Sequence, residues 1–284
     1  MQWFYLSLFS LLLFSSSSII QRKLLRDIAD LNPVIFGFLF QALVGLFAVP
    51  IFLVYKGTIS SSFIIWQYII IAGILYSLSN FLLYHAIKIT EISRVSIIGS
   101  SRSLWVLIGS MIILGEKITA SNLLGLLLIV FSLFLIFWKS KEQIGLNQGQ
   151  KLALFAVIFS GFAVVVDGLI LRDFSAGFYL IISSLFTGFG TLAIKPSSIN
   201  KIKPFKRIKV FVPLVLTSAF FSLAVFLLYT SYQIGGKMSS VLPITQSTAV
   251  LTIFLSALFL KERKDLPKKI IALALCVLGI YFLK

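Results

Sequence analysis

The sequence predicts an all-α integral membrane protein with ten transmembrane helices, arranged as two inverted five-helix repeats. Three observations predict this fold class. The composition is 59% hydrophobic and 12% charged with a mean hydropathy of +1.05, far outside the range of soluble globular domains. The apolar residues fall into ten long runs separated by short connections. Short motifs of the first half also recur in the second half at a nearly constant spacing.

The ten apolar runs each approach the ~20 residues that a helix needs to cross a bilayer. Lipid offers no hydrogen-bond partners to the backbone, so we expect every run to be a helix. The first run has no basic segment before it, so we expect a retained helix rather than a cleaved signal peptide. Pro33, Pro213 and Pro267 are expected in first turns, where a missing N–H costs nothing. The runs span residues 3–21, 33–55, 63–86, 95–114, 119–138, 151–171, 175–194, 210–232, 238–260 and 267–283.

The repeat relates residues that lie 145 or 146 positions apart. The tetrapeptide FLLY at 81–84 recurs at 226–229. The tetrapeptide LGEK at 114–117 corresponds to LKER at 260–263, and each ends an apolar run that is followed by one more. A duplication of the whole five-run unit explains both pairs.

This duplication divides the chain into a first repeat, 1–145, and a second repeat, 146–284. Each repeat contains five apolar runs, which is an odd number. A unit with an odd number of spans must cross the membrane the second time in the opposite sense. Inverted repeats of this kind build secondary transporters, in which the substrate pathway lies between the halves near the bilayer midplane.

The basic residues alternate between the two sides of the predicted bundle. Of the 25 Lys and Arg residues, 19 lie in or beside the odd-numbered connections, whereas the even-numbered connections hold only Lys56, Lys117, Arg172 and Lys237. The positive-inside rule therefore predicts that the odd connections are cytoplasmic and that both termini are outside. We attribute the net charge of +16 to this orientation rather than to nucleic-acid binding, and the connection 195–209 could also contact anionic lipid heads.

Several motifs of the chain resemble the drug/metabolite transporter superfamily, and in particular its ten-helix EamA type. Glu116 and Glu262 match the acidic corner that ends each repeat of that family. Pro243 matches a proline that the family usually carries before the second glutamate, and 86–90 resembles the turn after the third helix. Two positions depart from the family pattern, because Phe14-Ser15 replaces Trp-Gly and Gln41 replaces an arginine.

The resemblance implies a multi-pass transporter of the bacterial cytoplasmic membrane that exports amino acids or related metabolites without a cofactor. Many members of the family are described with cytoplasmic termini, which conflicts with the charge distribution of this chain. The resemblance adds a cargo class that the residues themselves do not specify.

Glu116 and Glu262 lie at the ends of spans, beside Lys117 and Arg263. One possible role is a coupling carboxylate in transport. The other is a helix corner, in which the carboxylate accepts hydrogen bonds from the amides that begin the next helix. Their position favours the corner, so we interpret Glu116, Glu262 and Pro243 as a structural repeat motif.

Arg102 lies in the middle of the run 95–114, too far from either end to reach the interface easily. Charge at this depth normally faces a wet cavity or a partner. A guanidinium in a cavity is suited to a carboxylate or another anionic substrate group. The alternative is a structural ion pair, with Asp167 as the partner. Asp167 lies about one turn from the end of its run, where it could reach interfacial water, and it is also a candidate for proton coupling.

Further polar side chains mark helix faces that could line the pathway. Tyr76, Asn80 and Tyr84 follow an i, i+4, i+8 pattern, and Tyr229 is the repeat partner of Tyr84. Such tyrosines could instead satisfy their hydroxyls between helices. Thr248 corresponds to Arg102 in the repeat and belongs to a polar stripe. The stripe consists of Thr245, Thr248 and Thr252, and Gln246 lies beside it.

We therefore predict a secondary active transporter that moves a small metabolite by alternating access. One alternative is an importer or exchanger of a carboxylate- or nucleotide-like metabolite, favoured if Arg102 is unpaired. An alternative from another class is a non-transporting membrane partner subunit. The predicted substrate-binding residues are Asn80, Tyr84, Arg102, Tyr229, Gln246 and Thr248.

The sequence argues against catalysis and against a nucleotide-driven mechanism. The chain has one histidine and one cysteine, Cys276, so neither a nucleophile–base pair nor a metal cluster is expected. No P-loop or dinucleotide fingerprint is present. We expect no metal, no cofactor and no nucleic-acid partner, and the partners are the substrate and membrane lipids. One chain contains both halves, so a monomer is sufficient and a dimer is possible.

Overall fold

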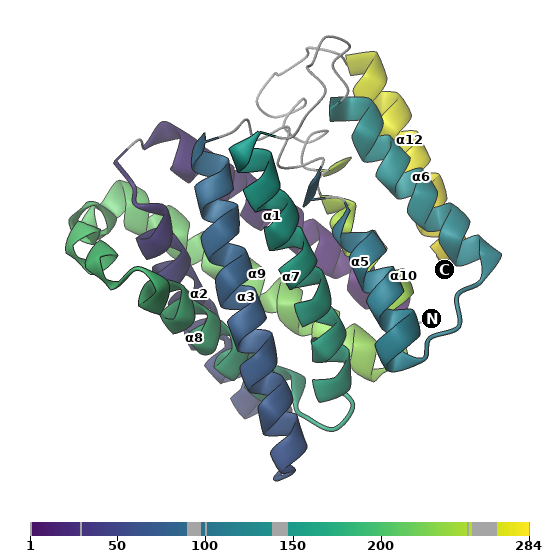
Figure 1. Cartoon of the computed structure of the whole chain (residues 1–284), viewed down its shortest axis with the longest axis horizontal. Coiled ribbons are helices and arrows are strands. Elements are labelled where there is room, and N and C mark those ends of the chain that lie inside the picture. Colours follow the sequence, from purple (N-terminus) through teal and green to yellow (C-terminus); the bar gives the residue numbers. More distant parts are fainter. Residues whose placement is uncertain are drawn as a thin grey trace.

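The computed structural model describes residues 2–28, 30–89, 98–99, 101–137, 147–248, 250–251 and 266–283. Within these residues the chain is a bundle of helices without a strand, which confirms the predicted all-α class (Figure 1). The elements are α1 Gln2–Asp27, α2 Pro33–Tyr55, α3 Phe63–Ile89, α5 Arg102–Gly109, η1 Ser110–Leu114, α6 Ala120–Phe137, α7 Gln148–Ile170, α8 Ala176–Ile194, η2 Pro196–Lys201, η3 Lys203–Lys206, α9 Ile208–Gln233, α10 Met238–Gln246 and α12 Leu266–Leu283.

Six of the described helices are long and apolar enough to cross a membrane, namely Gln2–Gln21, Pro33–Tyr55, Phe63–Ala86, Gln148–Ile170, Ala176–Ile194 and Ile208–Gln233. Three shorter apolar helices are Arg102–Leu114, Ala120–Ser132 and Ile270–Leu283. These six helices correspond to six of the ten predicted spans, and α12 covers the whole of the predicted span 267–283. Parts of the predicted spans 95–114 and 238–260 lie outside the described residues.

Local sequence signals explain where several helices begin. Asn32 caps α2, accepting hydrogen bonds from the next residues, and Pro33 occupies the first turn as predicted. Pro267 likewise lies in the first turn of α12. The expectation for Pro213 was wrong, because α9 begins at Ile208 and places this proline inside the helix. Pro213 has no N–H, so the carbonyl one turn before it loses its helical hydrogen bond. That carbonyl lies at the start of α9, beside the basic connection, where water can replace the bond.

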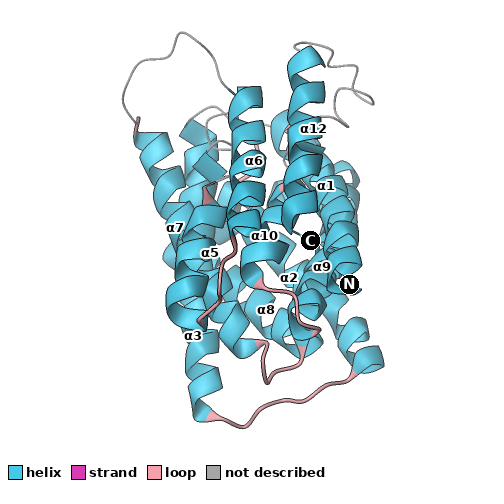
Figure 2. Ribbon diagram, turned by 90° about the vertical axis from the view of Figure 1, so that its right-hand side faces the viewer, coloured by secondary structure: helices cyan, strands magenta, loops and turns pink. Residues whose placement is uncertain are grey.

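The most extensive packing joins helices of different halves. The pairs are α3 with α7, α1 with α9, α2 with α8, and α6 with α12. The pairing is the same for both halves. The first helix of each half packs against the third helix of the other, the second helices pack against each other, and so do the fifth helices. The α6–α12 pair lies side by side at one end of the bundle, while the other three pairs form the main body (Figures 1 and 2).

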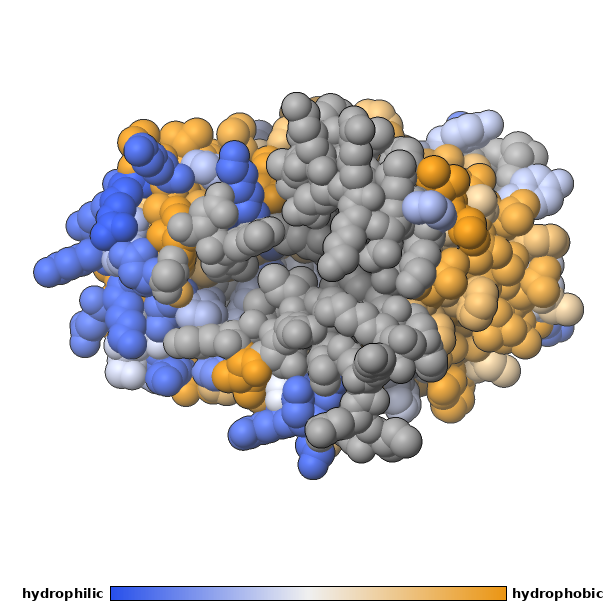
Figure 3. All heavy atoms as spheres, turned by 90° about the horizontal axis from the view of Figure 1, so that it is seen from above, coloured by the Kyte–Doolittle hydropathy of each residue, from blue (hydrophilic) through white to orange (hydrophobic). Residues whose placement is uncertain are grey.

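Many large apolar side chains are exposed on the surface of the bundle, as a lipid-facing surface requires. Large exposed apolar side chains include Leu53, Phe63, Ile112 and Ile208. Figure 3 shows hydrophilic side chains gathered over the end of the bundle that carries η2 and η3 in Figure 1, and apolar side chains over the opposite end. Arg207, which follows η3, forms an ion pair with Asp30 at 3.1 Å and ties this basic segment to the start of α2.

Candidate functional site: a polar cavity between the two halves

A cavity of about 320 Å³ lies between the two halves of the chain. Its walls come from α1, α2, α3 and α5 of the first half and from α7, α8, α9 and α10 of the second half. This volume is within the range of small-molecule binding sites. Among the predicted substrate-binding residues, those that line the cavity are Asn80, Arg102, Tyr229, Gln246 and Thr248.

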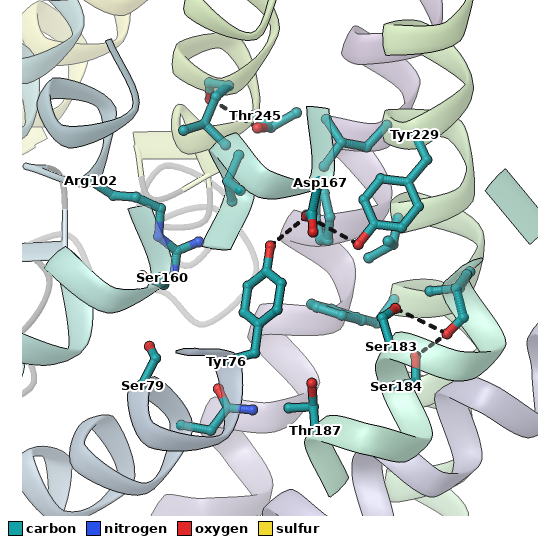
Figure 4. A pocket seen from close by; sticks show the side chains of 18 of the residues that line it. Tyr76, Ser79, Arg102, Ser160, Asp167, Ser183, Ser184, Thr187, Tyr229 and Thr245 are labelled. Atoms are coloured by element: carbon teal, nitrogen blue, oxygen red, sulfur yellow. Dashed lines mark hydrogen bonds between the residues drawn. The ribbon is translucent and has the colours of Figure 1, made fainter. Parts of the chain in front are cut away.

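Asp167 is the acidic group of this cavity, and it is almost completely buried at 1% exposure. Its carboxylate accepts hydrogen bonds from Tyr76 on α3 at 2.6 Å and from Tyr229 on α9 at 3.3 Å. Tyr179 on α8 donates a third hydrogen bond. Figure 4 shows the bonds from Tyr76 and Tyr229. As predicted, Asp167 lies about one turn from the end of its helix, α7. It does not reach interfacial water, however, because α7 packs among the other helices and three tyrosyl hydroxyls surround the carboxylate.

Arg102 is the first residue of α5 and is half-buried in the cavity wall. Figure 4 shows its guanidinium extending into the cavity on the side of Ser160, toward Tyr76. No carboxylate of the described residues lies within 4.0 Å of the guanidinium, so the ion pair with Asp167 that the sequence allowed is not formed. In the described part of the chain, Arg102 therefore presents five N–H donors to the cavity without a protein acceptor.

Neutral polar groups also line the cavity. Thr245 and Thr248 of the predicted stripe both line the cavity, whereas Thr252 lies outside the described residues. Their hydroxyls donate to their own helix backbone, Thr245 to Leu242 O at 2.9 Å and Thr248 to Thr245 O at 2.5 Å. Each hydroxyl oxygen keeps its acceptor capacity toward the cavity. The wall thus offers hydrogen bonds without charge.

Tyr84 is the predicted site residue that the structure places elsewhere. Its ring packs edge-on against Phe36 with the centroids 6.1 Å apart, and it lies against Gly37 of α2 so closely that a Cβ there would come within 2.6 Å of the tyrosine ring. Eight residues along a helix advance the direction of a side chain by about 80°, so Tyr84 leaves the face that Tyr76 occupies. Tyr84 packs in the apolar cluster between α2 and α3 instead.

The sequence analysis did not identify two tyrosines of the site. Tyr179 is fully buried and stacks on Tyr229 with the ring centroids 5.3 Å apart. Tyr232 lines the cavity, and its buried hydroxyl has no hydrogen-bond partner among the described residues. The spacing of Tyr229 and Tyr232 at i and i+3 was a usable signal for Tyr232. Tyr179 had none, since its role depends on where the folded bundle places α8 relative to Asp167.

The structure corrects the expected role of Glu116. Its carboxylate does accept hydrogen bonds from helix-initiating amides, but these belong to Met238 and Ser239 of α10 in the other half, at 2.8 and 3.0 Å. The next helix, α6, is capped by its own residues, because the hydroxyl of Thr119 accepts from the backbone N–H of Asn122 at 3.2 Å. Glu262 lies outside the described residues. Pro243 is buried inside α10.

Comparison with known proteins identifies the class to which this fold and cavity belong. The model of the EamA-like transporter family matches the chain twice, over residues 1–138 and 147–284. These two matches together span nearly the whole sequence, so the chain belongs to the EamA-like transporter family. This confirms the resemblance inferred from its motifs.

The structural comparison agrees with this assignment. A solved chain described as "Crystal structure of protein" is similar to this one with a TM-score of 0.76 and 14% sequence identity, over 99% of this chain and 97% of that chain. At this identity the likeness shows the fold alone. The comparison with curated proteins found no match. The protein is a multi-pass integral membrane transporter of the drug/metabolite transporter superfamily, and members of its family are generally not enzymes.

Proposed function

We propose that this protein is a secondary active transporter that moves a small metabolite by alternating access, with the substrate bound in the cavity between its halves. The observation that carries this proposal is the unpaired guanidinium of Arg102 in a polar cavity that both halves enclose. The cavity also argues against a non-transporting partner subunit, which would need a sealed interface rather than a binding space. No driving nucleotide site is required for transport of this kind.

The arrangement of helices supports two inverted five-helix repeats. Each of the main packing pairs joins one helix of the first half to one helix of the second half. The same pairs result if the two halves trade places. A substrate site at such an interface can be exposed to one side or the other by rocking one half against its counterpart. Since both halves are in one chain, a monomer is sufficient for the cycle.

We propose that Arg102 binds an acidic group of the substrate, and that Asn80, Gln246 and Thr248 supply uncharged hydrogen bonds. Tyr229 and Tyr232 would contribute hydroxyl and ring contacts from α9. Efflux of amino acids or related metabolites is the cargo that the family suggests. The unpaired state of Arg102 also favours the second candidate, import or exchange of a carboxylate- or nucleotide-like metabolite, because both carry the planar or tetrahedral anion that a guanidinium binds bidentately.

Asp167 is the proposed proton-coupling group. It is the one acidic side chain in the described wall of the cavity, and its hydrogen-bond partners come from helices of both halves. Rocking of the halves would therefore change the hydrogen bonds around this carboxylate and its readiness to hold a proton. This gives a physical link between conformation and proton binding without a direct contact to the substrate.

Ligand-dependent thermal stability tests the substrate site directly. The purified protein is heated with amino acids, dicarboxylates, nucleotides, polyamines and cationic drugs in turn. A ligand at about 100 times its Kd stabilises the folded state by about 2.7 kcal/mol, which is measurable as a rise in Tm. We expect an acidic ligand to raise the Tm of the wild type and of Arg207→Ala, whose guanidinium is exposed far from the cavity, but not of Arg102→Ala.

Two results would contradict this assignment. A ligand that stabilises the wild type and Arg102→Ala equally would remove Arg102 from the substrate site. A cationic ligand that stabilises both proteins equally would indicate that the substrate binds at the tyrosines around Asp167.

A further inference from the structure

Glu116 follows the turn that ends η1, and this turn orients its side chain toward the other half of the molecule. The π-helical turn η1 ends at Gly115, which adopts a left-handed conformation with φ of 67°. The N–H of Glu116 donates back to Ser110 O at 3.1 Å, which closes the end of the helix. This reversal sends the Glu116 side chain away from its own half and toward the start of α10.

The start of α10 needs such a partner. Its N-cap residue, Lys237, provides no side-chain hydrogen bond, and the first turn contains no acidic residue. The first backbone N–H groups of a helix have no partner within the helix, and a carboxylate there is favoured by the helix dipole. The two oxygens of Glu116 satisfy the amides of Met238 and Ser239, so the first half supplies the cap that α10 lacks.

A second contact holds the same two segments together. The amide group of Asn122, in the first turn of α6, donates to the hydroxyl of Ser240 at 3.1 Å. Three consecutive residues of α10 are thus bonded to Glu116, in the connection between the fourth and fifth predicted spans, and to Asn122, at the start of the fifth. Figure 2 shows α10 lying beside α5 and α6, as these bonds require.

The other even-numbered connections are bonded at this side as well. The N–H of Ser175, before α8, donates to Thr58 O at 2.8 Å, which joins the sixth–seventh connection to the second–third. The side chain of Gln233, at the end of α9, donates to Leu171 O at 3.1 Å and to Phe174 O at 2.8 Å. In this state the even-numbered side of the molecule is therefore linked across the boundary between the halves.

We propose that Glu116 is a positioning residue for transport: its carboxylate latches α10 to the first half and holds the cavity closed on the even-numbered side. The proposal rests on the alternating-access function proposed above. α10 carries Leu242, Thr245 and Gln246 of the cavity wall, so releasing its first turn moves that wall. Opening the even-numbered side requires that the two charge-assisted bonds break, and closing requires that they form again.

The test measures from which side the cavity is reached, rather than whether substrate is transported. Cys276 is replaced by alanine, and Ser184→Cys places one thiol on the cavity wall. The protein is reconstituted in vesicles, and labelling by a membrane-impermeant maleimide is followed from each side. Lys56→Cys, in the exposed second–third connection, identifies the even-numbered side and supplies the rate of an unobstructed thiol.

In Glu116→Gln one oxygen that accepts an amide hydrogen bond is replaced by an NH₂ donor that repels it. We expect labelling of Ser184→Cys from the even-numbered side to rise roughly 3- to 30-fold, the equilibrium change that corresponds to loss of a helix cap. Labelling from the opposite side should fall. Asp173→Asn is the matched control, since Asp173 is an exposed carboxylate on the same side that makes no side-chain hydrogen bond among the described residues, and it should leave both rates unchanged.

Three outcomes overturn the latch. Equal labelling of Glu116→Gln and the parent protein, both folded, would show that the contact does not hold the cavity closed. An increase from both sides, with a lower Tm, would make Glu116 a purely structural cap. A thiol at Ser184 that reacts from neither side in any variant would overturn the transport pathway together with the latch, whereas failure of the Arg102 ligand test alone would leave the latch intact.

Discussion

At the scale of single residues, the site is organised by two opposite charges that do not touch. Asp167 is enclosed by the hydroxyls of Tyr76, Tyr179 and Tyr229, while Arg102 remains free of protein acceptors in the described structure. A buried ion pair would neutralise both groups and leave little for a ligand to gain. Keeping them apart leaves the guanidinium available for an anion and the carboxylate available for a proton.

Substitution of Asp167 by asparagine separates these two functions. Asparagine has nearly the same shape but cannot bind and release a proton. We expect Asp167→Asn vesicles to exchange substrate down its gradient, while the ability of a pH gradient to drive accumulation is lost; a tenfold accumulation corresponds to about 1.4 kcal/mol. Uptake of labelled substrate with and without an imposed pH gradient measures this. Accumulation that persists at the wild-type ratio would exclude Asp167 as the coupling group, and Asp173→Asn serves as the control.

At the scale of secondary-structure elements, glycines set how closely the fifth helices of the two halves approach. A Cβ at Gly125 of α6 would lie 2.7 Å from the carbonyl oxygen of Gly279 in α12, and a Cβ at Gly279 would lie 2.8 Å from the carbonyl oxygen of Gly125. No side chain fits at these distances. Small residues of this kind let membrane helices pack backbone against backbone.

A larger residue at this contact should separate α6 from α12. We expect Gly279→Val to lower the free energy of unfolding by about 1–3 kcal/mol, as overpacking typically does. Gly99→Ala is the control, because no atom of the described residues lies within 4 Å of a Cβ at Gly99. The Tm of each variant in detergent is the measurement. An unchanged Tm for Gly279→Val would show that the two helices can move apart without loss.

At the scale of the whole molecule, the connections sort onto two sides with different charge. The basic segment around η2 and η3 occupies one end of the bundle (Figure 3). The even-numbered connections are bonded to one another, as the links from Ser175 to Thr58 and from Glu116 to α10 show. An even number of spans would place both termini with the even-numbered connections.

The positive-inside rule then makes a prediction about orientation in the membrane. A reporter that fluoresces only in the cytoplasm should be dark when fused after residue 284 and bright when inserted in the connection 195–209. The same fusion to a periplasmic enzyme reporter should give the reverse pattern. A bright C-terminal fusion would overturn the predicted orientation, and would agree with the cytoplasmic termini of many relatives.

Much of the candidate site was predictable from depth alone. Polar groups in the middle of apolar runs are costly, so Asn80 and Arg102 were expected at a wet cavity, and both line it. The predicted positions of Tyr84 and Glu116 were less accurate. Their positions depend on helix rotation and on which half lies opposite, and neither quantity is encoded in the spacing of residues along one helix.

The sequence by itself determined the all-α membrane class, the division into two related halves and the family, because hydropathy, motif spacing and charge alternation are local properties that survive without coordinates. Only the tertiary structure decided the partners. It placed three tyrosines from three helices around Asp167, left Arg102 without a protein acceptor, and directed Glu116 to α10 instead of α6. The physical reason is that these contacts join different helices, and those of Tyr76 and Glu116 cross between the halves, so they arise only once the helices pack against one another.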